Sequence, residues 1–213
     1  MTTSEQIAAD LLRIGAVALR PDDPFTWASG RLSPVYTDNR LTLSHPDVRG
    51  RIVGAFADAL AEVGEVDAIS ATATAGIPHG ALLADRAVLP FSYVRSSAKG
   101  HGRENRIEGR VEEGQRIVLV EDLVSTGGSV LSAAEALREA GATVVAALAV
   151  FTYGFPEADQ AFETAGLPLV TLTDFPTLAE SARQSGALGE DAWDVLRDWR
   201  DDPKGWSSAR GGA

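Results

Sequence analysis

The stretch that decides the fold is residues 116–130, which read RIVLVEDLVSTGGSV. Its apolar residues 117–120 lead directly into two acidic residues, Glu121 and Asp122. A short apolar run bounded by polar residues is typical of a strand that is buried on both faces of a parallel sheet. The Ser/Thr/Gly cluster at 125–129 predicts a tight loop at the C-terminal end of this strand and the start of a helix.

The loop and the acid pair together indicate the chemistry of a ligand. A glycine-rich loop before a helix presents backbone N–H groups, hydroxyls and a helix N-terminus to an anion. Two carboxylates beside this loop would repel a bare phosphate, so the ligand should also carry hydroxyl groups or a divalent cation. A ribose 5-phosphate meets this requirement, with its hydroxyls on Glu121 and Asp122 and its phosphate on residues 125–129. The simpler alternative is a strand–loop–helix turn with a capping Ser or Thr and solvent-exposed acids. The order of strand, acid pair, two apolar residues and T-G-G-S is more specific than such a turn requires.

The composition restricts the class of protein. The chain has 213 residues, enough for one domain with a substantial core. Its formal net charge of −11 argues against general nucleic-acid binding and requires a site for an anionic substrate to be locally basic. The longest apolar run, near residues 144–151, is too short to cross a membrane, the N-terminus does not resemble a secretory signal, and there are no cysteines. We therefore expect a cytoplasmic protein that binds neither nucleic acid nor membranes.

The rest of the chain predicts an alternation of strands and helices. Apolar residues at helical spacing predict a helix over residues 4–19, with Ser4 as its cap. Alternation of this kind is typical of α/β proteins with a parallel sheet, in which ligands bind at the C-terminal ends of the strands. The other predicted elements are a hairpin or loop at 25–40, strands at 66–71, 90–95, 143–151 and 167–172, helices at 45–63, 77–87, 157–165, 174–185 and 187–200, and a loosely ordered tail.

Two segments between these elements are candidates for ligand contacts. Residues 72–77 (T-A-T-A-G-I) form a second strand–loop–helix unit whose small residues would let a ligand approach the backbone, although a tight turn alone would also explain them. Residues 96–114 are polar and long for a connection, as functional lids often are. A basic lid of this kind would close over a polyanion, and the alternative is a solvated charged hairpin. The basic side chains in or next to this segment are Arg95, Lys99, His101, Arg103, Arg106 and Arg110.

These motifs resemble those of orotate phosphoribosyltransferases, a branch of the type I phosphoribosyltransferases that use 5-phosphoribosyl 1-pyrophosphate (PRPP). The resemblance covers about residues 25–155. Residues 121–129 match the PRPP motif of the superfamily, while an F-x-x-x-S-G-x-x-S-P-x-Y segment and a Y-V-R-x-x-x-K-x-H-G lid motif indicate the orotate branch. The matching residues are Phe25, Ser29, Gly30, Ser33, Pro34 and Tyr36, the A-T-A-G-I loop at 73–77, then Tyr93, Val94, Arg95, Lys99, His101 and Gly102, and I-E-G at 107–109.

The resemblance implies an α/β fold in a single domain, residues 1–213. A five-stranded parallel sheet flanked by helices would carry a small hood, made from residues 1–45 and C-terminal residues, and a lid at about 96–114. The implied activity is transfer of the 5-phosphoribosyl group from PRPP to orotate, which gives orotidine 5′-phosphate and pyrophosphate in pyrimidine biosynthesis. Mg²⁺ would be carried mainly by PRPP, without direct protein ligands. Since the lid lysine and histidine of this family usually act in the partner subunit's site, a homodimer is also implied.

The resemblance further implies which residues act on PRPP. Lys99, His101 and Asp122 would be the catalytic residues. The loop for the pyrophosphate would be Thr74, Ala75 and Gly76. PRPP would be held by Arg95, Lys99, His101, Glu121, Asp122, Leu123, Val124, Ser125, Thr126, Gly127, Gly128 and Ser129.

Three departures from the family pattern concern the orotate end of the site. Many relatives have a lysine where Ala28 stands and a second basic residue where Ser96 stands. Many also have an aspartate–arginine pair after the fourth strand, where this chain reads F-T-Y-G at 151–154. Ser125 is the orotate contact that the family pattern implies, and Arg40 is the candidate that replaces the missing cation.

Other function classes stay open at this point. A phosphoribosyltransferase for a purine or for uracil would share the PRPP motif, although the lid motif disfavours it. A regulator that kept the fold but lost catalysis would bind nucleotides or nucleic acid, which the acidic composition and the presence of Lys99 and His101 disfavour. A purely structural α/β domain would leave the acid pair and the basic lid unexplained.

Overall fold

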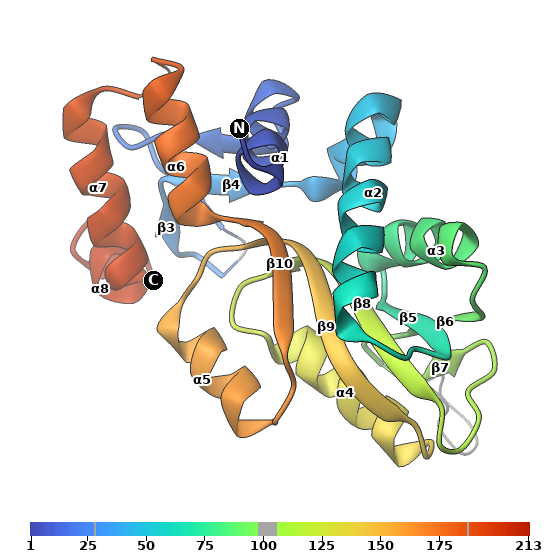
Figure 1. Ribbon diagram of the computed structural model, residues 1–213. Helices are drawn as coiled ribbons and strands as arrows, with labels where there is room; N and C mark the ends of the chain where they lie inside the picture. The colour runs from blue at the N-terminus through green and yellow to red at the C-terminus, as the bar shows by residue number, and fades with distance from the viewer. Residues whose placement is uncertain (28, 98–105, 187) are drawn as a thin grey trace.

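The fold is built on a six-stranded sheet with the strand order β10-β9-β8-β5-β6-β7 (Figure 1). The computed structural model describes residues 1–27, 29–97, 106–186 and 188–213. Neighbouring strands are parallel except β7, which runs antiparallel to β6. The predicted α/β class and its five parallel strands are confirmed, and β7 is a sixth strand that the sequence did not predict. The strands are β5 (Ala68–Thr72), β6 (Phe91–Val94), β7 (Ile107–Glu108), β8 (Arg116–Val124), β9 (Thr143–Thr152) and β10 (Leu169–Asp174).

Strand β8 lies inside the sheet and is covered on both faces. Its residues Ile117, Val118, Leu119 and Val120 are fully buried, as the apolar run predicts. Alternate side chains of a strand point to opposite faces, so Val118 and Val120 pack in one apolar cluster and Ile117 and Leu119 pack in another. A ligand can therefore reach this strand only at its ends.

Helices cover both faces of the sheet (Figure 1). The first apolar cluster contains side chains of α2 and α3, and the second contains side chains of α4 and α5. This is the layered architecture in which ligands bind at the C-terminal ends of parallel strands. Within the described ranges, no helix has both the length and the apolar character to cross a bilayer. The helices are α2 (Pro46–Val63), α3 (Gly76–Ala87), α4 (Gly128–Glu139) and α5 (Pro156–Thr164).

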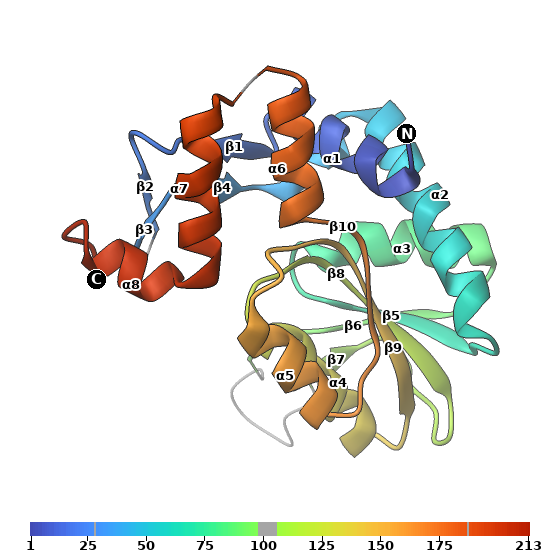
Figure 2. The same ribbon diagram turned by 60° about the vertical axis from the view of Figure 1, so that its left-hand side comes forward.

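The two ends of the chain form a further layer beyond the point where β10 leads into α6 (Figure 2). Two small antiparallel pairs, β1 with β4 and β2 with β3, lie there beside α6, α7 and α8. We call residues 1–45 and 175–213 together the hood. Its elements are α1 (Thr3–Arg13), β1 (Val17–Leu19), β2 (Phe25–Thr26), β3 (Leu32–Ser33), β4 (Val35–Thr37), the 3-10 helix η1 (Asn39–Ser44), α6 (Phe175–Gln184), α7 (Glu190–Asp201) and α8 (Pro203–Ser208).

The first helix is shorter than predicted and has a different cap. The sequence predicts a helix over 4–19 with Ser4 as its cap, whereas α1 stops before Gly15, whose φ of 73° turns the chain into β1. The cap is Thr2, which accepts a hydrogen bond from the backbone N–H of Glu5 while the Glu5 side chain accepts one from Thr2. This reciprocal capping box satisfies two N–H groups, which a cap at Ser4 would not do.

The tail is also ordered, contrary to the sequence-based prediction. Helix α8 buries the indole of Trp206, which is 6% exposed. Ser207 Oγ accepts a hydrogen bond of 2.9 Å from the backbone N–H of Leu32. The N–H of the last residue, Ala213, donates to the carbonyl of Gly30 over 3.0 Å. The tail therefore packs against β3 and the turn that precedes it, a contact that no local pattern indicates.

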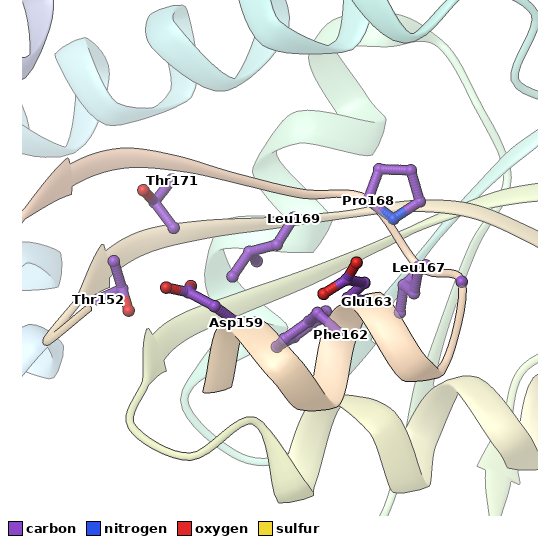
Figure 3. A pocket seen from close by; sticks show the side chains of 9 residues that line it. Thr152, Asp159, Phe162, Glu163, Leu167, Pro168, Leu169 and Thr171 are labelled. Atoms are coloured by element: carbon purple, nitrogen blue, oxygen red, sulfur yellow. The ribbon is translucent and has the colours of Figure 1, made fainter. Parts of the chain in front are cut away.

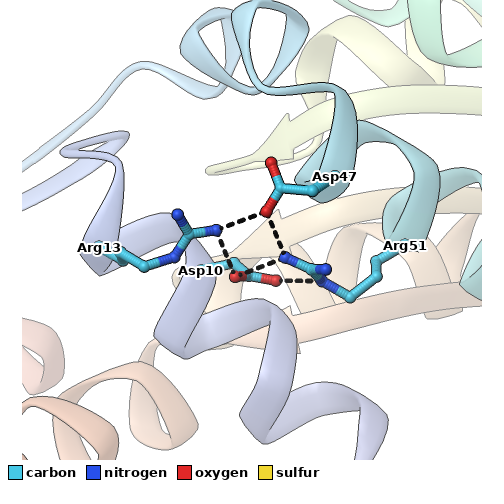
Figure 4. Close-up of polar contacts among 4 residues, drawn as sticks. All are labelled: Asp10, Arg13, Asp47 and Arg51. Carbon is cyan, nitrogen blue, oxygen red and sulfur yellow. Dashed lines mark hydrogen bonds and ion pairs between the residues drawn. The ribbon is translucent and has the colours of Figure 1, made fainter.

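Four charged side chains join α1 to α2 (Figure 4). Asp10 is almost fully buried and accepts hydrogen bonds from Arg51 at 2.6 and 2.9 Å and from Arg13 at 2.9 Å. Both arginines also contact Asp47 at 2.9 Å. Burial by itself raises the pKa of Asp10, but the hydrogen bonds from the arginines outweigh this effect and hold the pKa below its usual value. The network fixes the first helix of the hood to a helix that covers the sheet.

Candidate active site

The predicted acid pair lies at the C-terminal end of β8. Glu121 is buried and Asp122 is half-buried. Glu121 Oε1 accepts a hydrogen bond of 3.0 Å from the backbone N–H of Asp122. Burial raises the pKa of both carboxyls, that of Glu121 to about 8, because a carboxylate loses hydration inside the protein. A ligand that offers hydroxyl donors or positive charge would be stabilised at this position.

The small-residue loop at 74–76 packs against the same strand. A Cβ atom at Gly76 would lie 2.6 Å from the carbonyl oxygen of Val120 and 2.9 Å from Thr72 Oγ1. Thr72 Oγ1 itself donates a hydrogen bond of 3.3 Å to that carbonyl. Only glycine lets α3 begin so close to β8, and the loop predicted for the pyrophosphate therefore adjoins the acid pair.

The loop that follows β8 leads into α4 as predicted. The helix begins at Gly128, and no side chain caps its N-terminus, so backbone N–H groups of its first turn lack an intrahelical acceptor. Gly127 has a φ of 83°, and a Cβ atom there would lie 2.7 Å from Phe162 Cε2. Both the backbone conformation and the packing therefore require glycine at this position. Among the predicted PRPP-binding residues, Leu123 and Val124 end β8, Ser125 is half-buried, and Thr126, Gly128 and Ser129 are exposed.

A cavity of about 240 Å³ lies between the start of α4 and the ends of β5 and β6. Arg95 forms an ion pair with Glu108, with Nε and Oε1 3.3 Å apart. Arg106 Nη1 donates a hydrogen bond of 3.0 Å to Ser132 Oγ on α4. The cavity is therefore lined by two guanidinium groups in an acidic protein, as an anion site requires. Its lining residues are Thr72, Ala73, Val94, Arg95, Ser96, Arg106, Gly128, Ser129, Ser132 and Ala133.

The predicted lid begins after β6 and includes the strand that pairs with β6. The backbone N–H of Arg95 donates to the carbonyl of Arg106 over 2.9 Å, and β7 then continues antiparallel to β6. The predicted lid of 96–114 thus contains a strand, Ile107–Glu108. The predicted catalytic residues Lys99 and His101 lie outside the described residues. Arg95 and Arg106, which flank this part of the lid, therefore meet beside the cavity.

The hood contributes a polar edge next to the acid pair. Asn39 Nδ2 donates a hydrogen bond of 2.7 Å to the carbonyl oxygen of Asp122. Arg40, the predicted orotate contact, is exposed and paired with Asp38 at 2.6 and 2.9 Å. The positive charge of Arg40 also acts to lower the pKa of Asp122, although the effect of burial is larger. The structure thus brings Arg40 to the same edge as the acid pair.

Sequence reasoning missed Tyr153, which joins the hood to this edge. Its hydroxyl donates a hydrogen bond of 3.0 Å to Thr37 Oγ1, and its backbone N–H donates to the carbonyl of Val124 over 3.3 Å. Burial raises the pKa of Tyr153 to about 12. The sequence gives only a weak signal for this contact, a tyrosine in the F-T-Y-G segment where relatives have an aspartate–arginine pair.

A larger cavity, of about 600 Å³, lies between α5 and β10 (Figure 3). Asp159 and Glu163 on α5 point into it. Its described lining contains no basic side chain, so it would repel a phosphate or a carboxylate. The acid pair and the smaller, basic cavity are therefore the candidate active site. The lining residues are Thr152, Asp159, Phe162, Glu163, Gly166, Leu167, Pro168, Leu169 and Thr171.

Comparisons with known proteins identify the family of the chain. Residues 44–160 match the family model of the phosphoribosyl transferase domain. An orotate phosphoribosyltransferase of Lactococcus lactis is 50% identical over 209 residues, which are 98% of this chain and 100% of the relative. One from Streptococcus pneumoniae is 50% identical over 207 residues, which are 97% of this chain and 99% of the relative.

Solved structures lead to the same family. An orotate phosphoribosyltransferase from Aeropyrum pernix superposes with a TM-score of 0.74 at 33% identity and covers 86% of this chain and 99% of its own. A UMP synthase of Leishmania donovani has a TM-score of 0.79 at 26% identity and covers 92% of this chain and 42% of its own. The chain therefore belongs to the orotate phosphoribosyltransferase family and is a pentosyltransferase.

Proposed function

We propose that the chain transfers the 5-phosphoribosyl group from PRPP to orotate at the C-terminal ends of β5, β6 and β8. The observation that carries the proposal is the position of the acid pair, Glu121 and Asp122, near the end of the strand that leads to the uncapped N-terminus of α4, which itself lines a cavity together with two arginines. One ligand with a phosphate, two ribose hydroxyls and a pyrophosphate matches these three features. The high identity to orotate phosphoribosyltransferases supports orotate as the acceptor.

The 5-phosphate of PRPP would lie on residues 125–129. The free N–H groups at the start of α4 would donate to its oxygens, together with the hydroxyls of Ser125, Thr126 and Ser129. Glu121 and Asp122 would accept hydrogen bonds from the ribose hydroxyls. These contacts fix the sugar while leaving its C1 atom open toward the cavity.

The pyrophosphate would lie between the 74–76 loop and Arg95. During the reaction a ring nitrogen of orotate forms a bond to C1 of the ribose, and the bond from C1 to the pyrophosphate oxygen breaks. Negative charge grows on the pyrophosphate, and Arg95, Lys99 and His101 would stabilise it. Asp122 would stabilise the positive charge that develops on the sugar ring. Closure of the lid would exclude water and so limit hydrolysis of PRPP.

Orotate would lie between the phosphate loop and the hood. Ser125 would donate a hydrogen bond to it, and Arg40 would bind its carboxylate. The exposed guanidinium of Arg40 supports this role, since an exchange of Asp38 for the substrate carboxylate keeps the cation paired. The neighbouring acid pair would keep a second anion out of this position.

Four further features are proposed with this function. Mg²⁺ would arrive bound to PRPP, and the raised pKa values of Glu121 and Asp122 fit a position that favours a nearby cation. When bound, the ion would neutralise charge on the departing pyrophosphate. The chain would act as a single domain with its hood and lid, in a cytoplasmic homodimer whose lids reach the partner's site. The hydrogen bonds from Asn39 to Asp122 and from Tyr153 to Thr37, which join the hood to the sheet, support one domain.

The test is the loss of orotate absorbance in the near ultraviolet with PRPP and Mg²⁺, with and without a chelator. We expect a loss that requires Mg²⁺ and is matched by pyrophosphate release. An unchanged absorbance, with PRPP still bound, would reject orotate as the acceptor. A panel of other nucleobases would then separate a different base specificity from a regulator without catalysis.

A further inference from the structure

We propose that Tyr153 is a positioning residue for orotate, which holds the hood segment 36–40, with Tyr36 and Arg40, in place beside Asp122. The hydrogen bond of 3.0 Å from the Tyr153 hydroxyl to Thr37 Oγ1 is the observation that carries the proposal. The role of Arg40 in it rests on the proposed function. Tyr153 itself need not touch the substrate.

The side chains of the hood segment 36–40 point in two directions, toward the core or toward solvent. Thr37 and Asn39 point toward the core, where they meet Tyr153 and the carbonyl of Asp122. Tyr36 is 45% exposed, and the side chain of Arg40 is 67% exposed. The inward residues thus fix the segment, and the outward residues are available to a ligand.

Tyr153 is itself held rigidly, so its hydroxyl is a fixed reference point. The residue is 3% exposed, and its ring stacks on Phe155 with centroids 5.3 Å apart. Trp199 and Trp27 approach the same ring at 5.6 and 6.0 Å. Its backbone N–H donates to the carbonyl of Val124, the residue before the phosphate loop. Because its pKa is raised to about 12, the hydroxyl keeps its proton at every working pH.

The hydrogen bond matters because few polar contacts hold this part of the hood. Within the described residues, two hydrogen bonds join segment 36–40 to the core, one from Tyr153 to Thr37 and one from Asn39 to Asp122. The phosphate loop at 125–129 and the loop at 74–76 belong to the core and do not depend on either bond. Loss of the Tyr153 hydroxyl should therefore weaken orotate binding much more than PRPP binding.

The test compares Tyr153→Phe and Thr37→Val, alone and together, with the wild type. Each change removes one partner of the hydrogen bond and keeps the size of the side chain. We expect each to raise the KM for orotate roughly fivefold, the size of effect that one hydrogen bond supports, with the KM for PRPP nearly unchanged. The double variant should be no worse than either single variant, because both remove the same bond.

Two controls separate positioning from folding. Thr164→Val removes an exposed hydroxyl on α5 whose one hydrogen bond among the described residues goes to the Gln160 carbonyl, and it should leave both KM values unchanged. Val144→Ala shortens a buried side chain in the other apolar cluster, at the end of β9 away from the site, so it should lower the melting temperature and leave both KM values unchanged. Tyr153→Phe should raise the KM for orotate and not the KM for PRPP, with only a small change in melting temperature.

Three results would overturn the proposal. The first is an unchanged KM for orotate in Tyr153→Phe, while the wild type remains active. The second is an equal rise in both KM values, and the third is fully additive effects in the double variant. A wild type that does not consume orotate would reject the proposed function, and this inference with it.

Discussion

Asn39 donates a hydrogen bond of 2.7 Å from its side-chain amide to the backbone carbonyl of Asp122. The two residues are 83 positions apart in the chain, and the bond ties the 3-10 helix of the hood to the strand that ends at the acid pair. Asn39 is buried, and its Oδ1 has no partner within the part of the chain that the structure describes. The contact therefore fixes the backbone at Asp122, and with it the position of the Asp122 carboxyl in the acid pair.

Asn39→Ala should reduce kcat/KM for orotate about tenfold and destabilise the protein by about 1–2 kcal/mol, because a partly buried carbonyl loses its donor. Steady-state kinetics and urea denaturation would measure the two effects. Thr42→Val is the matched control, since it removes a buried hydrogen bond of 2.6 Å within the same 3-10 helix, to the Asn39 carbonyl. If the control lowered kcat/KM as much as Asn39→Ala, the effect would come from the 3-10 helix as a whole.

The raised pKa of Glu121 predicts a pH dependence of stability. Burial raises this pKa from the ordinary value of 4.5 for a glutamate to about 8, so the unfolded chain releases its proton at a lower pH than the folded protein. Below pH 4.5 both states are protonated, and the free energy of unfolding should then fall as the pH rises from 4.5 to 8. Because Glu121→Gln cannot ionise, the free energy of unfolding of this variant should fall much less over the same pH range.

Urea denaturation of both proteins across this pH range, without ligand, measures the effect. Glu157→Gln, at an exposed position in the first turn of α5, is a control for the loss of one carboxylate and should keep the pH dependence of the wild type. A Glu121→Gln variant with the same pH dependence as the wild type would show that this carboxyl is ionised at neutral pH in the folded protein.

The ion-pair network between α1 and α2 should contribute to stability and not to catalysis. Asp10→Asn removes a buried charge that two arginines contact, and we expect a loss of about 2 kcal/mol, because hydrogen bonds between charged groups are worth more than neutral ones. Asp47 is 54% exposed, so Asp47→Asn should cost less than about 1 kcal/mol. Denaturation measures both losses, and kcat should stay unchanged. A lower kcat in Asp10→Asn at full folding would contradict this assignment.

Local sequence patterns predicted features that lie within one stretch of the chain. They missed contacts between residues that are far apart in the sequence. Strand β8, the acid pair and the loop before α4 are encoded in one continuous stretch of apolar, acidic and small residues, and the structure confirms this arrangement. The bond between Tyr153 and Thr37 spans 116 residues, and the one between Ser207 and Leu32 spans 175. No periodicity or motif links such pairs, because they meet only when the hood packs on the sheet. For the same reason no local pattern predicts the helical tail, since its order depends on contacts with β3 and with Gly30 in the turn before it.

The last prediction concerns the proposed sharing of the lid between subunits. Lys99→Ala removes a proposed lid contact, and Asp122→Asn removes a carboxyl of the acid pair, so each variant alone should be nearly inactive. If the lid acts in the partner's site, a mixed dimer has one site with both defects and one site with neither. Mixing the two variants under conditions that exchange subunits should therefore restore activity to about a quarter of the wild-type value, the statistical limit for random dimers. Each variant incubated alone is the control, and size-exclusion chromatography with light scattering would establish that dimers are present. If dimers exchange subunits and no activity returns, the lid acts in its own subunit, because every site of a mixed dimer then keeps one defect.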